Sequence, residues 1–227
     1  MNIVEVMNVS KAYRQGEMKV NALSDIQLTV EKGGFVALAG PSGSGKTTLL
    51  NLIGGLDSMD SGSITVEDRK INEMKDSELA EMRLHRVGFV FQAYNLIPVL
   101  SAEENVEFVM LLQGVPKNER QERSRAVLDD VGLSGMYNRR PAELSGGQQQ
   151  RVAVARAIVS DPAMVLADEP TANLDSKTGE SLLTMMREMN EKKGVTFIFS
   201  THDRMVMEYA RRLVQLKDGR ITGEEKH

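Results

Sequence analysis

The stretch GFVALAGPSGSGKTT, residues 34–48, decides the fold of this 227-residue chain. Its first part, FVALA, is a continuous apolar run, which is typical of a strand covered on both faces. The run stops at Gly40 and leads into TTLLNLIGGL (47–56), which predicts a helix that ends at Gly54 and Gly55. A buried strand that turns through glycines into a helix is the building unit of an α/β protein with a parallel sheet.

The turn between this strand and this helix carries a phosphate-binding pattern. GPSGSGKT (40–47) matches G-x-x-x-x-G-K-[ST] in full. Glycines let backbone N–H groups face a phosphate, and the start of the helix adds positive potential. We therefore expect Lys46 to reach the β- and γ-phosphates of a nucleotide and the Thr47 hydroxyl to bind Mg²⁺. The predicted nucleotide-binding residues of this loop are Gly40, Pro41, Ser42, Gly43, Ser44, Gly45, Lys46, Thr47 and Thr48.

Two acids follow a second apolar run, AMVLADEP (163–170). Asp168 ends that strand, where the metal-binding carboxylate of such folds lies, so it is the predicted second Mg²⁺ ligand. Glu169 comes next and is the predicted catalytic base, which polarises the attacking water. Taken alone, Glu169 would be read as a solvated acid at a strand end; beside Asp168 and the phosphate loop we favour the catalytic interpretation.

The remaining pattern predicts an α/β fold with a mainly parallel sheet, preceded by an antiparallel β part. Alternating runs predict half-buried strands at 2–9 and 26–30, and an Asp-Gly turn predicts a closing hairpin at 213–222. Short strands are predicted at 63–66, 86–92, 163–168 and 195–201, with a helix at about 176–193. Helices that end at glycines are predicted at 101–114 and 118–132, and a further helix is predicted after LSGG. The helical stretch near 93–157 is expected to be an inserted subdomain.

The composition of the chain argues against several classes of function. A net charge of −4 argues against a surface that binds nucleic acid. The absence of cysteine excludes disulfides and thiolate chemistry. No stretch approaches the ~18–20 apolar residues that a membrane span needs. Any role at a membrane is therefore expected to come through a partner.

The motifs GPSGSGKTT, FVFQ, LSGGQQQR, VLADEPTANLDS and STHD occur in this order, and together they carry a family resemblance. In this order and spacing they resemble the nucleotide-binding subunit of an ATP-binding cassette (ABC) transporter, along essentially the whole chain. The resemblance implies one domain over 1–227, with a RecA-like core at about 1–92 and 158–227 and a helical subdomain at about 93–157. It also implies ATP and Mg²⁺ as cofactors and hydrolysis of ATP as the activity.

The resemblance assigns the second half of the nucleotide site to another copy of the chain. In the family, two subunits pack head to tail, and each signature motif caps the ATP bound by the other subunit. The matching residues here are Ser145, Gly146, Gly147 and Gln148. Their residue types agree with this role, because a serine hydroxyl and glycine N–H groups at a helix start can bind an anion. A simple glycine-containing helix cap would explain the motif alone.

Further roles follow from single matching positions. Gln92 matches the glutamine that contacts Mg²⁺, the water and the membrane partner, and His202 matches the histidine near the γ-phosphate. Asp175 matches the loop that crosses the dimer interface; many members have Ser-Ala-Leu-Asp there, so Ala172 and Asn173 are mild departures. Tyr13 matches the aromatic residue that stacks on adenine, an interaction that would tolerate some GTP.

The flanking runs are similar to the lipoprotein-releasing and macrolide-exporting branch of the family. That similarity implies an integral membrane permease as partner and a peripheral location on the cytoplasmic side of the inner membrane. Tyr94, Leu96 and Phe108 are candidates for the permease groove, with core packing as the equal alternative. A cell-division-type ATPase that signals without transport remains the alternative function. Chromosome-maintenance ATPases need a coiled coil that residues 49–143 are too few to form, and translation factors carry two cassettes.

Overall fold

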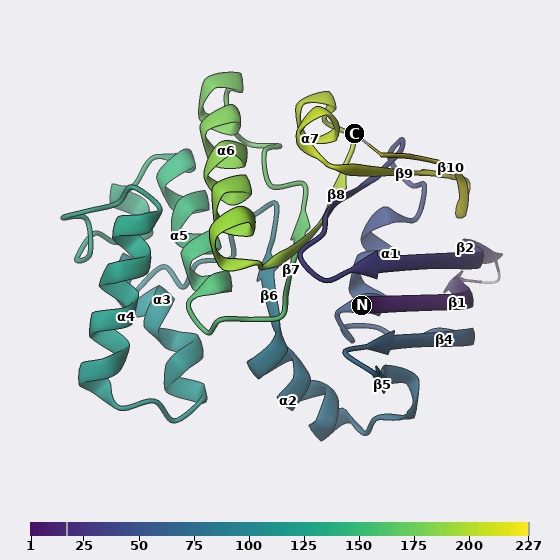
Figure 1. The fold of residues 1–227 in the computed structure, drawn as a ribbon, viewed down its shortest axis with the longest axis horizontal. Helices are drawn as coiled ribbons and strands as arrows, with labels where there is room; N and C mark the ends of the chain where they lie inside the picture. The colour runs from purple at the N-terminus through teal and green to yellow at the C-terminus, as the bar shows by residue number, and fades with distance from the viewer. Residues whose placement is uncertain (17, 227) are drawn as a thin grey trace.

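The computed structural model describes residues 1–16 and 18–226, and its strands form two sheets (Figure 1). One sheet has four strands in the order β2–β1–β4–β5, and the other has six in the order β10–β9–β3–β8–β7–β6. The strands are β1 (Asn2–Gln15), β2 (Met18–Glu31), β3 (Phe35–Ala39), β4 (Ser61–Val66), β5 (Arg69–Lys70), β6 (Val87–Val90), β7 (Met164–Asp168), β8 (Thr196–Thr201), β9 (Arg212–Lys217) and β10 (Arg220–Lys226).

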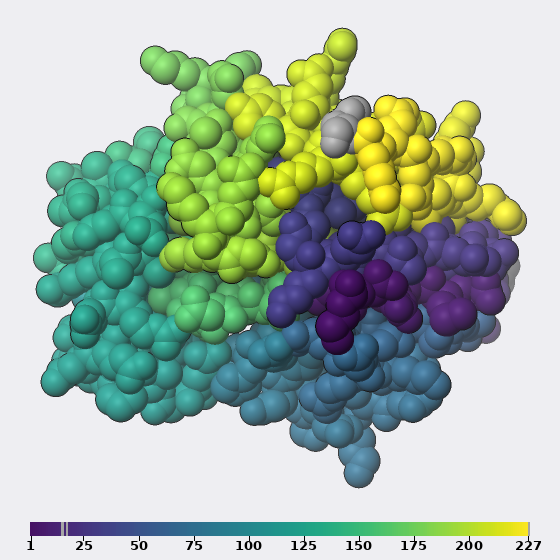
Figure 2. Space-filling view, in the orientation of Figure 1, coloured from purple at the N-terminus to yellow at the C-terminus, as the bar shows by residue number. Residues whose placement is uncertain are grey.

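Seven helices accompany the strands in the described part of the chain. They are α1 (Lys46–Ile53), α2 (Asp76–Arg86), α3 (Ala102–Leu112), α4 (Lys117–Asp130), α5 (Gly146–Ile158), α6 (Ser176–Lys193) and α7 (Arg204–Tyr209). In Figure 1 the helices α3, α4 and α5 gather on one side of the six-stranded sheet, and the four-stranded sheet lies on the other. The space-filling view shows the same division, with the teal helical residues at one end and the purple and blue strands at the other (Figure 2).

The central strands of the six-stranded sheet are buried on both faces, as the sequence predicts. On β3, Phe35 and Ala37 enter one hydrophobic core, while Val36 and Leu38 enter a second core on the opposite face. This alternation follows from the period of two in a strand. The first core is shared with α3 to α7 and the second with α1 and the antiparallel sheet. The predicted mixed architecture, parallel core plus antiparallel β part, is confirmed.

The parallel register places the carboxyl ends of four strands at one edge of the sheet. Ala39 of β3 pairs with Thr201 of β8, and Ser200 of β8 pairs with Asp168 of β7. One residue earlier, Ala167 of β7 pairs with Val90 of β6. The four segments that leave these strands therefore start side by side, although they are far apart in the sequence.

Two helices are absent from the sequence prediction. The helix α2 buries only Met82, so it lacks the apolar stripe from which a helix is recognised. Its start is instead fixed by a capping bond, in which the backbone N–H of Lys75 donates to Glu78 Oε2 at 2.9 Å. The second helix, α7, has six residues, which are too few for a periodic pattern.

Residues 93–157 contain the expected helices, α3, α4 and α5, and no strand. Residues 93–101 and 131–145 form turns and irregular segments around the helices, with one short 3-10 turn at Pro141–Glu143. The buried side chain of Asn105 explains the first irregular segment. Its Oδ1 accepts from Ile97 N at 2.8 Å, and its Nδ2 donates to the carbonyls of Ile97, Leu100 and Ser101. These bonds satisfy backbone groups that a helix would otherwise pair internally.

We expect Phe199→Ala to lower the free energy of unfolding by about 3–5 kcal/mol, because it empties a packed aromatic site. Phe199 is fully buried on β8, and its ring centroid lies 4.7 Å from that of Phe35. Urea denaturation of the purified chain measures the change. Met7→Ala, at a position that is 58% exposed, is the control and should stay within about 0.5 kcal/mol of the parent chain. Equal effects of the two variants would contradict the central position of β8 in the core.

Candidate nucleotide-binding site

The predicted phosphate loop connects β3 to α1 at the carboxyl edge of the sheet. Gly45 precedes the first helical residue and has φ 100°, a conformation that side chains rarely adopt. A Cβ at this position would lie 2.5 Å from the carbonyl oxygen of Ala22. No side chain caps the start of α1. Its first N–H groups are therefore available to an anion.

Lys46 lies folded over this loop. Its side chain is largely buried, and Nζ donates hydrogen bonds to the carbonyl oxygens of Gly40 (2.8 Å) and Pro41 (2.9 Å). The buried hydroxyl of Ser44 has no hydrogen-bond partner among the residues described. A phosphate in the loop would offer both groups stronger, anionic acceptors. The predicted loop residues Gly40 to Thr47 thus form one continuous cradle at the start of α1.

Two of the three predicted metal ligands, Thr47 and Asp168, are in direct contact. Thr47 Oγ1 donates a hydrogen bond of 3.0 Å to Asp168 Oδ1, although the two residues are 121 positions apart. A hydroxyl and a carboxylate suit Mg²⁺, which binds few protein oxygens and completes its shell with water and phosphate oxygens. The residues present therefore fit the ion. Residues 1–16 and 18–226 contain no group of three or more His, Asp or Glu side chains that could hold a metal ion.

Glu169 and His202 form a pair beside this contact. His202 Nδ1 lies 2.6 Å from Glu169 Oε1, and the backbone N–H of His202 donates to the same oxygen at 3.1 Å. Thr201 Oγ1 donates to Oε2 at 3.2 Å. Glu169 also has φ 45°, which is a strained conformation that costs of order 1–3 kcal/mol and occurs mainly at functional sites. The structure thus holds the carboxylate in one orientation at the end of β7, with the exposed imidazole next to it.

The loop after β6 carries the predicted residue Gln92. Its side chain is exposed, and its carbonyl oxygen accepts a hydrogen bond of 2.8 Å from Asn173 Nδ2. The next turn is held by Arg156 of α5, which donates to the carbonyls of Tyr94 (2.8 Å) and Asn95 (2.6 Å). Burial lowers the pKa of Arg156.

Arg156 was not among the residues that the sequence singled out, and Asn173 was noted only as a departure from the family pattern. An arginine in a helix of small apolar residues was the available signal for Arg156. The amide of Asn173 joins the loop of Gln92 to the loop that leads to Asp175. Both residues therefore hold the Gln92 loop through its backbone.

The motif around Ser145 lies at the start of α5, and no hydrogen bond of the described residues joins it to the phosphate loop. Ser145 Oγ accepts from Gln148 N at 3.3 Å, and Gln148 Oε1 accepts from Ser145 N at 2.9 Å. The motif is therefore a reciprocal helix cap, as the simpler interpretation of the sequence requires. A Cβ on Gly147 would lie 2.4 Å from Thr178 Cγ2, so the helix start packs tightly on α6. Ser145 itself is exposed, and Gly146, Gly147 and Gln148 are half-buried.

Asp175 also caps a helix. Its Oδ1 accepts from Thr178 N at 3.0 Å and its Oδ2 from Thr178 Oγ1 at 2.6 Å, at the start of α6. The hydrogen bond from the Thr178 hydroxyl, followed by that from its backbone, lowers the pKa of Asp175. The carboxylate is exposed, which leaves it accessible to a second molecule.

Tyr13 lies on β1, and its exposed side chain donates a hydrogen bond of 2.6 Å to Asp57 Oδ2. Burial and this hydrogen bond raise the pKa of Tyr13, while the side chain of Thr48 opposes the rise. Asp57 follows α1 in the chain, so this hydrogen bond ties Tyr13 to the segment that leaves the helix beginning at the phosphate loop.

An apolar groove lies between α2, β6 and α3. Its volume is about 630 Å³, and its lining includes Phe89, Phe91, Asn95 and Leu112. Of the three groove candidates named from the sequence, Phe108 is exposed on α3, while Leu96 packs against the first core. Tyr94 is half-buried, and its carbonyl oxygen accepts a hydrogen bond from Arg156. None of these three residues lines the groove, whereas their chain neighbours Asn95 and Val109 do.

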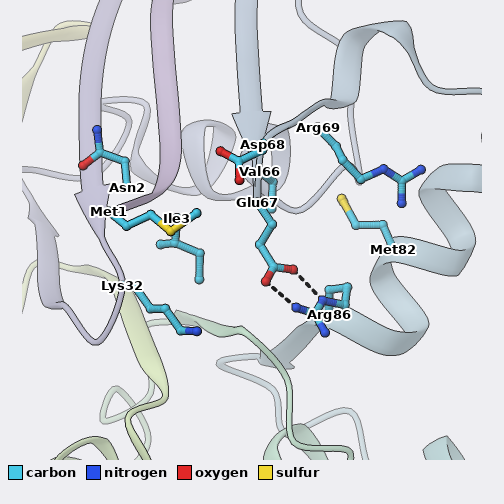
Figure 3. A pocket seen from close by; sticks show the side chains of 10 residues that line it. All are labelled: Met1, Asn2, Ile3, Lys32, Val66, Glu67, Asp68, Arg69, Met82 and Arg86. Atoms are coloured by element: carbon cyan, nitrogen blue, oxygen red, sulfur yellow. Dashed lines mark hydrogen bonds and ion pairs between the residues drawn. The ribbon is translucent and has the colours of Figure 1, made fainter.

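A second pocket, of about 340 Å³, lies beside the first residues of β1 and the turn between β4 and β5 (Figure 3). Arg86 and Glu67 point toward one another across it and form an ion pair. Met82 and Ile3 supply apolar lining. The predicted nucleotide-site residues do not line this pocket, so it is separate from the site.

A phosphate loop after a central parallel strand, a converging hydroxyl and carboxylate, and an acid–histidine pair on the neighbouring strands define a P-loop nucleoside triphosphatase. Comparison with known proteins gives the family. A family model described as ABC transporter matches residues 23–172, about two thirds of the chain. The chain therefore belongs to the ABC transporter family and is an ATP-binding ATPase cassette of it.

Individual relatives agree along the whole chain. An uncharacterized ABC transporter ATP-binding protein of Thermotoga maritima is 46% identical over 224 residues, which cover 99% of this chain and 95% of that protein. The dimeric structure of the cassette MJ0796, a protein of Methanocaldococcus jannaschii, is 43% identical, covers 98% of both chains and has a TM-score of 0.92. MJ0796 has also been solved as a dimer in a post-hydrolysis state with ADP and Pi, with a TM-score of 0.91.

The macrolide export ATP-binding/permease protein MacB of Aggregatibacter actinomycetemcomitans is 41% identical over 224 residues. The match covers 99% of this chain and 35% of MacB. The chain therefore spans about a third of that relative, which combines an ATP-binding part with a permease in one protein.

We expect Asn173→Ala to lower the rate of ATP hydrolysis about 2- to 10-fold, because it removes one neutral hydrogen bond to the Gln92 loop. ATP affinity should change less than about twofold, since the phosphate loop is untouched. Steady-state hydrolysis and equilibrium ATP binding separate the two effects. Asn118→Ala on the exposed face of α4 is the matched control. An unchanged rate in Asn173→Ala would contradict a role for this bond in holding Gln92.

Proposed function

We propose that two copies of this chain bind two ATP molecules between them and hydrolyse them to drive a membrane permease. One observation carries the proposal. The phosphate loop, Thr47, Asp168, Glu169 and His202 gather at one edge of the sheet, whereas the exposed helix start at Ser145 makes no hydrogen bond to them. A second copy would bring its Ser145 to this edge. The dimers reported for MJ0796 support this arrangement.

In the proposed mechanism the phosphates of ATP enter the loop and draw Lys46 from the carbonyls of Gly40 and Pro41. Thr47, Asp168 and Gln92 would hold Mg²⁺, which supplies charge neutralisation at the β- and γ-phosphates. Glu169, fixed by its hydrogen bonds, would orient the attacking water.

His202 stays next to Glu169 and would contact the γ-phosphate once the dimer closes. Most of the rate enhancement then comes from positioning and electrostatic stabilisation. The partner's signature motif contributes through the exposed Ser145 hydroxyl and the N-terminus of α5, and Asp175 would meet the partner across the same interface. Hydrolysis would let the dimer reopen.

We also propose that the groove lined by Phe89, Phe91 and Leu112 receives a segment of the permease. Leu112 and its neighbour Leu111 are exposed apolar side chains at the end of α3, a grouping that marks interaction surfaces. The ATP-binding/permease architecture of the MacB relatives supports a partner of the lipoprotein-release or macrolide-export type.

The part of the chain that the structure describes has no helix long and apolar enough to cross a bilayer. We propose separately that the protein lies at the cytoplasmic face of the inner membrane, held there by its permease, and the permease part of the MacB relatives supports this location. Within the chain, the core at about 1–92 and 158–227 would bind ATP, and the segment at about 93–157 would carry the signature to the partner.

The rate of ATP hydrolysis against protein concentration tests the proposal. A shared site predicts a rate that rises more than linearly with concentration, with a mass by light scattering that doubles in ATP. A linear rate from a chain that stays monomeric in ATP would overturn it.

We expect Glu169→Gln to bind ATP normally and to lose at least about 100-fold in turnover, because the amide keeps the shape but cannot act as a base. Single-turnover hydrolysis and ATP binding measure the two properties. Glu180→Gln on the exposed face of α6 is the control and should keep the parental rate. Substantial turnover by Glu169→Gln would assign the base to another residue.

We expect Ser145→Arg to abolish turnover while each chain still binds ATP, because a bulky cation at the start of α5 would block closure of the dimer. ATP binding, turnover and mass in ATP are measured together. Loss of ATP binding by the isolated chain would instead place Ser145 in its own chain's site and contradict the shared arrangement.

A further inference from the structure

A partly buried ion pair between Lys11 and Asp57 lies next to Tyr13. Lys11, on the same strand, is only 8% exposed, and its Nζ donates to Asp57 Oδ1 at 2.8 Å and to the carbonyl of Ser58 at 2.6 Å. The other oxygen of Asp57 accepts the 2.6 Å hydrogen bond from the Tyr13 hydroxyl. One carboxylate therefore binds both side chains that β1 presents on this face.

Asp57 is ionised in this setting. Burial alone would raise its pKa, but the hydrogen bonds from Lys11, Tyr13 and the backbone of Ser58 outweigh burial and lower the pKa below its ordinary value. The bond from the Tyr13 hydroxyl is therefore made to a charged acceptor, and such bonds are shorter and stronger than neutral ones. A long-range, charge-assisted bond of this kind fixes the phenol end of the ring.

The face of the ring is restricted as well. The ammonium of Lys11 lies over the Tyr13 ring, 5.0 Å from its centroid. A planar base can then stack only on the face that Lys11 leaves open. The exposed ring thus has a fixed hydroxyl, one occupied face and one accessible face.

The same loop ties the strand to the phosphate site. Asp57 and Asp60 follow α1, the helix that begins at Lys46. Asp60 Oδ2 accepts a hydrogen bond of 2.9 Å from the backbone N–H of Ala12, next to Tyr13. The phosphate loop therefore precedes α1, and the loop that holds the Tyr13 ring follows it.

We propose that Asp57, supported by Lys11, is a positioning residue for the nucleotide base: it orients the Tyr13 ring for stacking before ATP binds. This inference rests on the proposed role of Tyr13 in stacking on adenine. Fixing a side chain in advance removes the ordering cost from the binding step, which corresponds to about 3- to 10-fold in affinity.

Asp57 does not read the identity of the base. Its Oδ1 already accepts from Lys11 Nζ and from Ser58 N (2.7 Å), and its Oδ2 accepts from Tyr13. Asp57 therefore contributes by orienting the Tyr13 ring, and this orientation aids the stacking of any base. ATP and GTP should lose the same factor when the bond is removed.

The test compares Asp57→Asn, Tyr13→Phe and the double variant in the full chain. Both single variants should raise the KM for ATP about 3- to 10-fold and leave kcat within about twofold, and the double variant should show no further loss, because both act through one bond. The inhibition constant of inorganic tripolyphosphate, which has no base, should not change. Asp218→Asn, in the exposed turn between β9 and β10, is the matched control.

An unchanged KM in Asp57→Asn would overturn the proposal, as would equal losses for ATP and tripolyphosphate, which would indicate damage to the phosphate loop. Tyr13→Ala separates this failure from failure of the stacking role. If Tyr13→Ala weakens ATP binding and Asp57→Asn does not, only the positioning role falls. If Tyr13→Ala binds ATP as the parent chain does, the stacking role and the positioning role fall together.

Discussion

The in-register pairing of four parallel strands is the constraint on which the site depends. Because β3, β8, β7 and β6 end at one edge, the segments that follow neighbouring strands start about 5 Å apart. Each of these strands is followed by one part of the site: the phosphate loop follows β3, His202 follows β8, Glu169 follows β7 and Gln92 follows β6. The bond between Thr47 and Asp168 then closes the edge between α1 and β7. Two hydrophobic cores, one on each face of the sheet, keep this register fixed.

The rest of the machinery is attached to that edge through polar contacts of long sequence separation. Asn173 and Arg156 hold the backbone of the Gln92 loop, and Asp57 holds Tyr13. These contacts join the nucleotide site to α5 and to the groove beside α3. In the proposed complex, these contacts would link a change at the γ-phosphate to a docked partner. The exposed start of α5 makes no hydrogen bond to that edge among the described residues.

The central strands and the phosphate loop were predictable because their signals are local. FVALA and AMVLAD are continuous apolar runs, which is the composition of strands buried on both faces. The glycines around Lys46 allow the tight turn that a phosphate loop requires. The helix α2 escaped prediction because only Met82 of its side chains is buried. The bonds by which Asn105 orders the backbone at 97–101 depend on the buried position of one side chain, which no local pattern shows. Partners such as Asp57 for Tyr13 depend on the tertiary fold, which no local pattern contains.

Cross-linking between two different chains tests the shared site most directly. The sequence contains no cysteine, so the introduced cysteines are the sole thiols that can react. One chain carries Ser42→Cys in its phosphate loop and the other carries Ser145→Cys, both with Glu169→Gln, and a short bismaleimide is added to the mixture. The account predicts a cross-linked pair of the two different chains when ATP is present and none without it. A mixture that dimerises in ATP yet forms no such cross-link would contradict the head-to-tail arrangement.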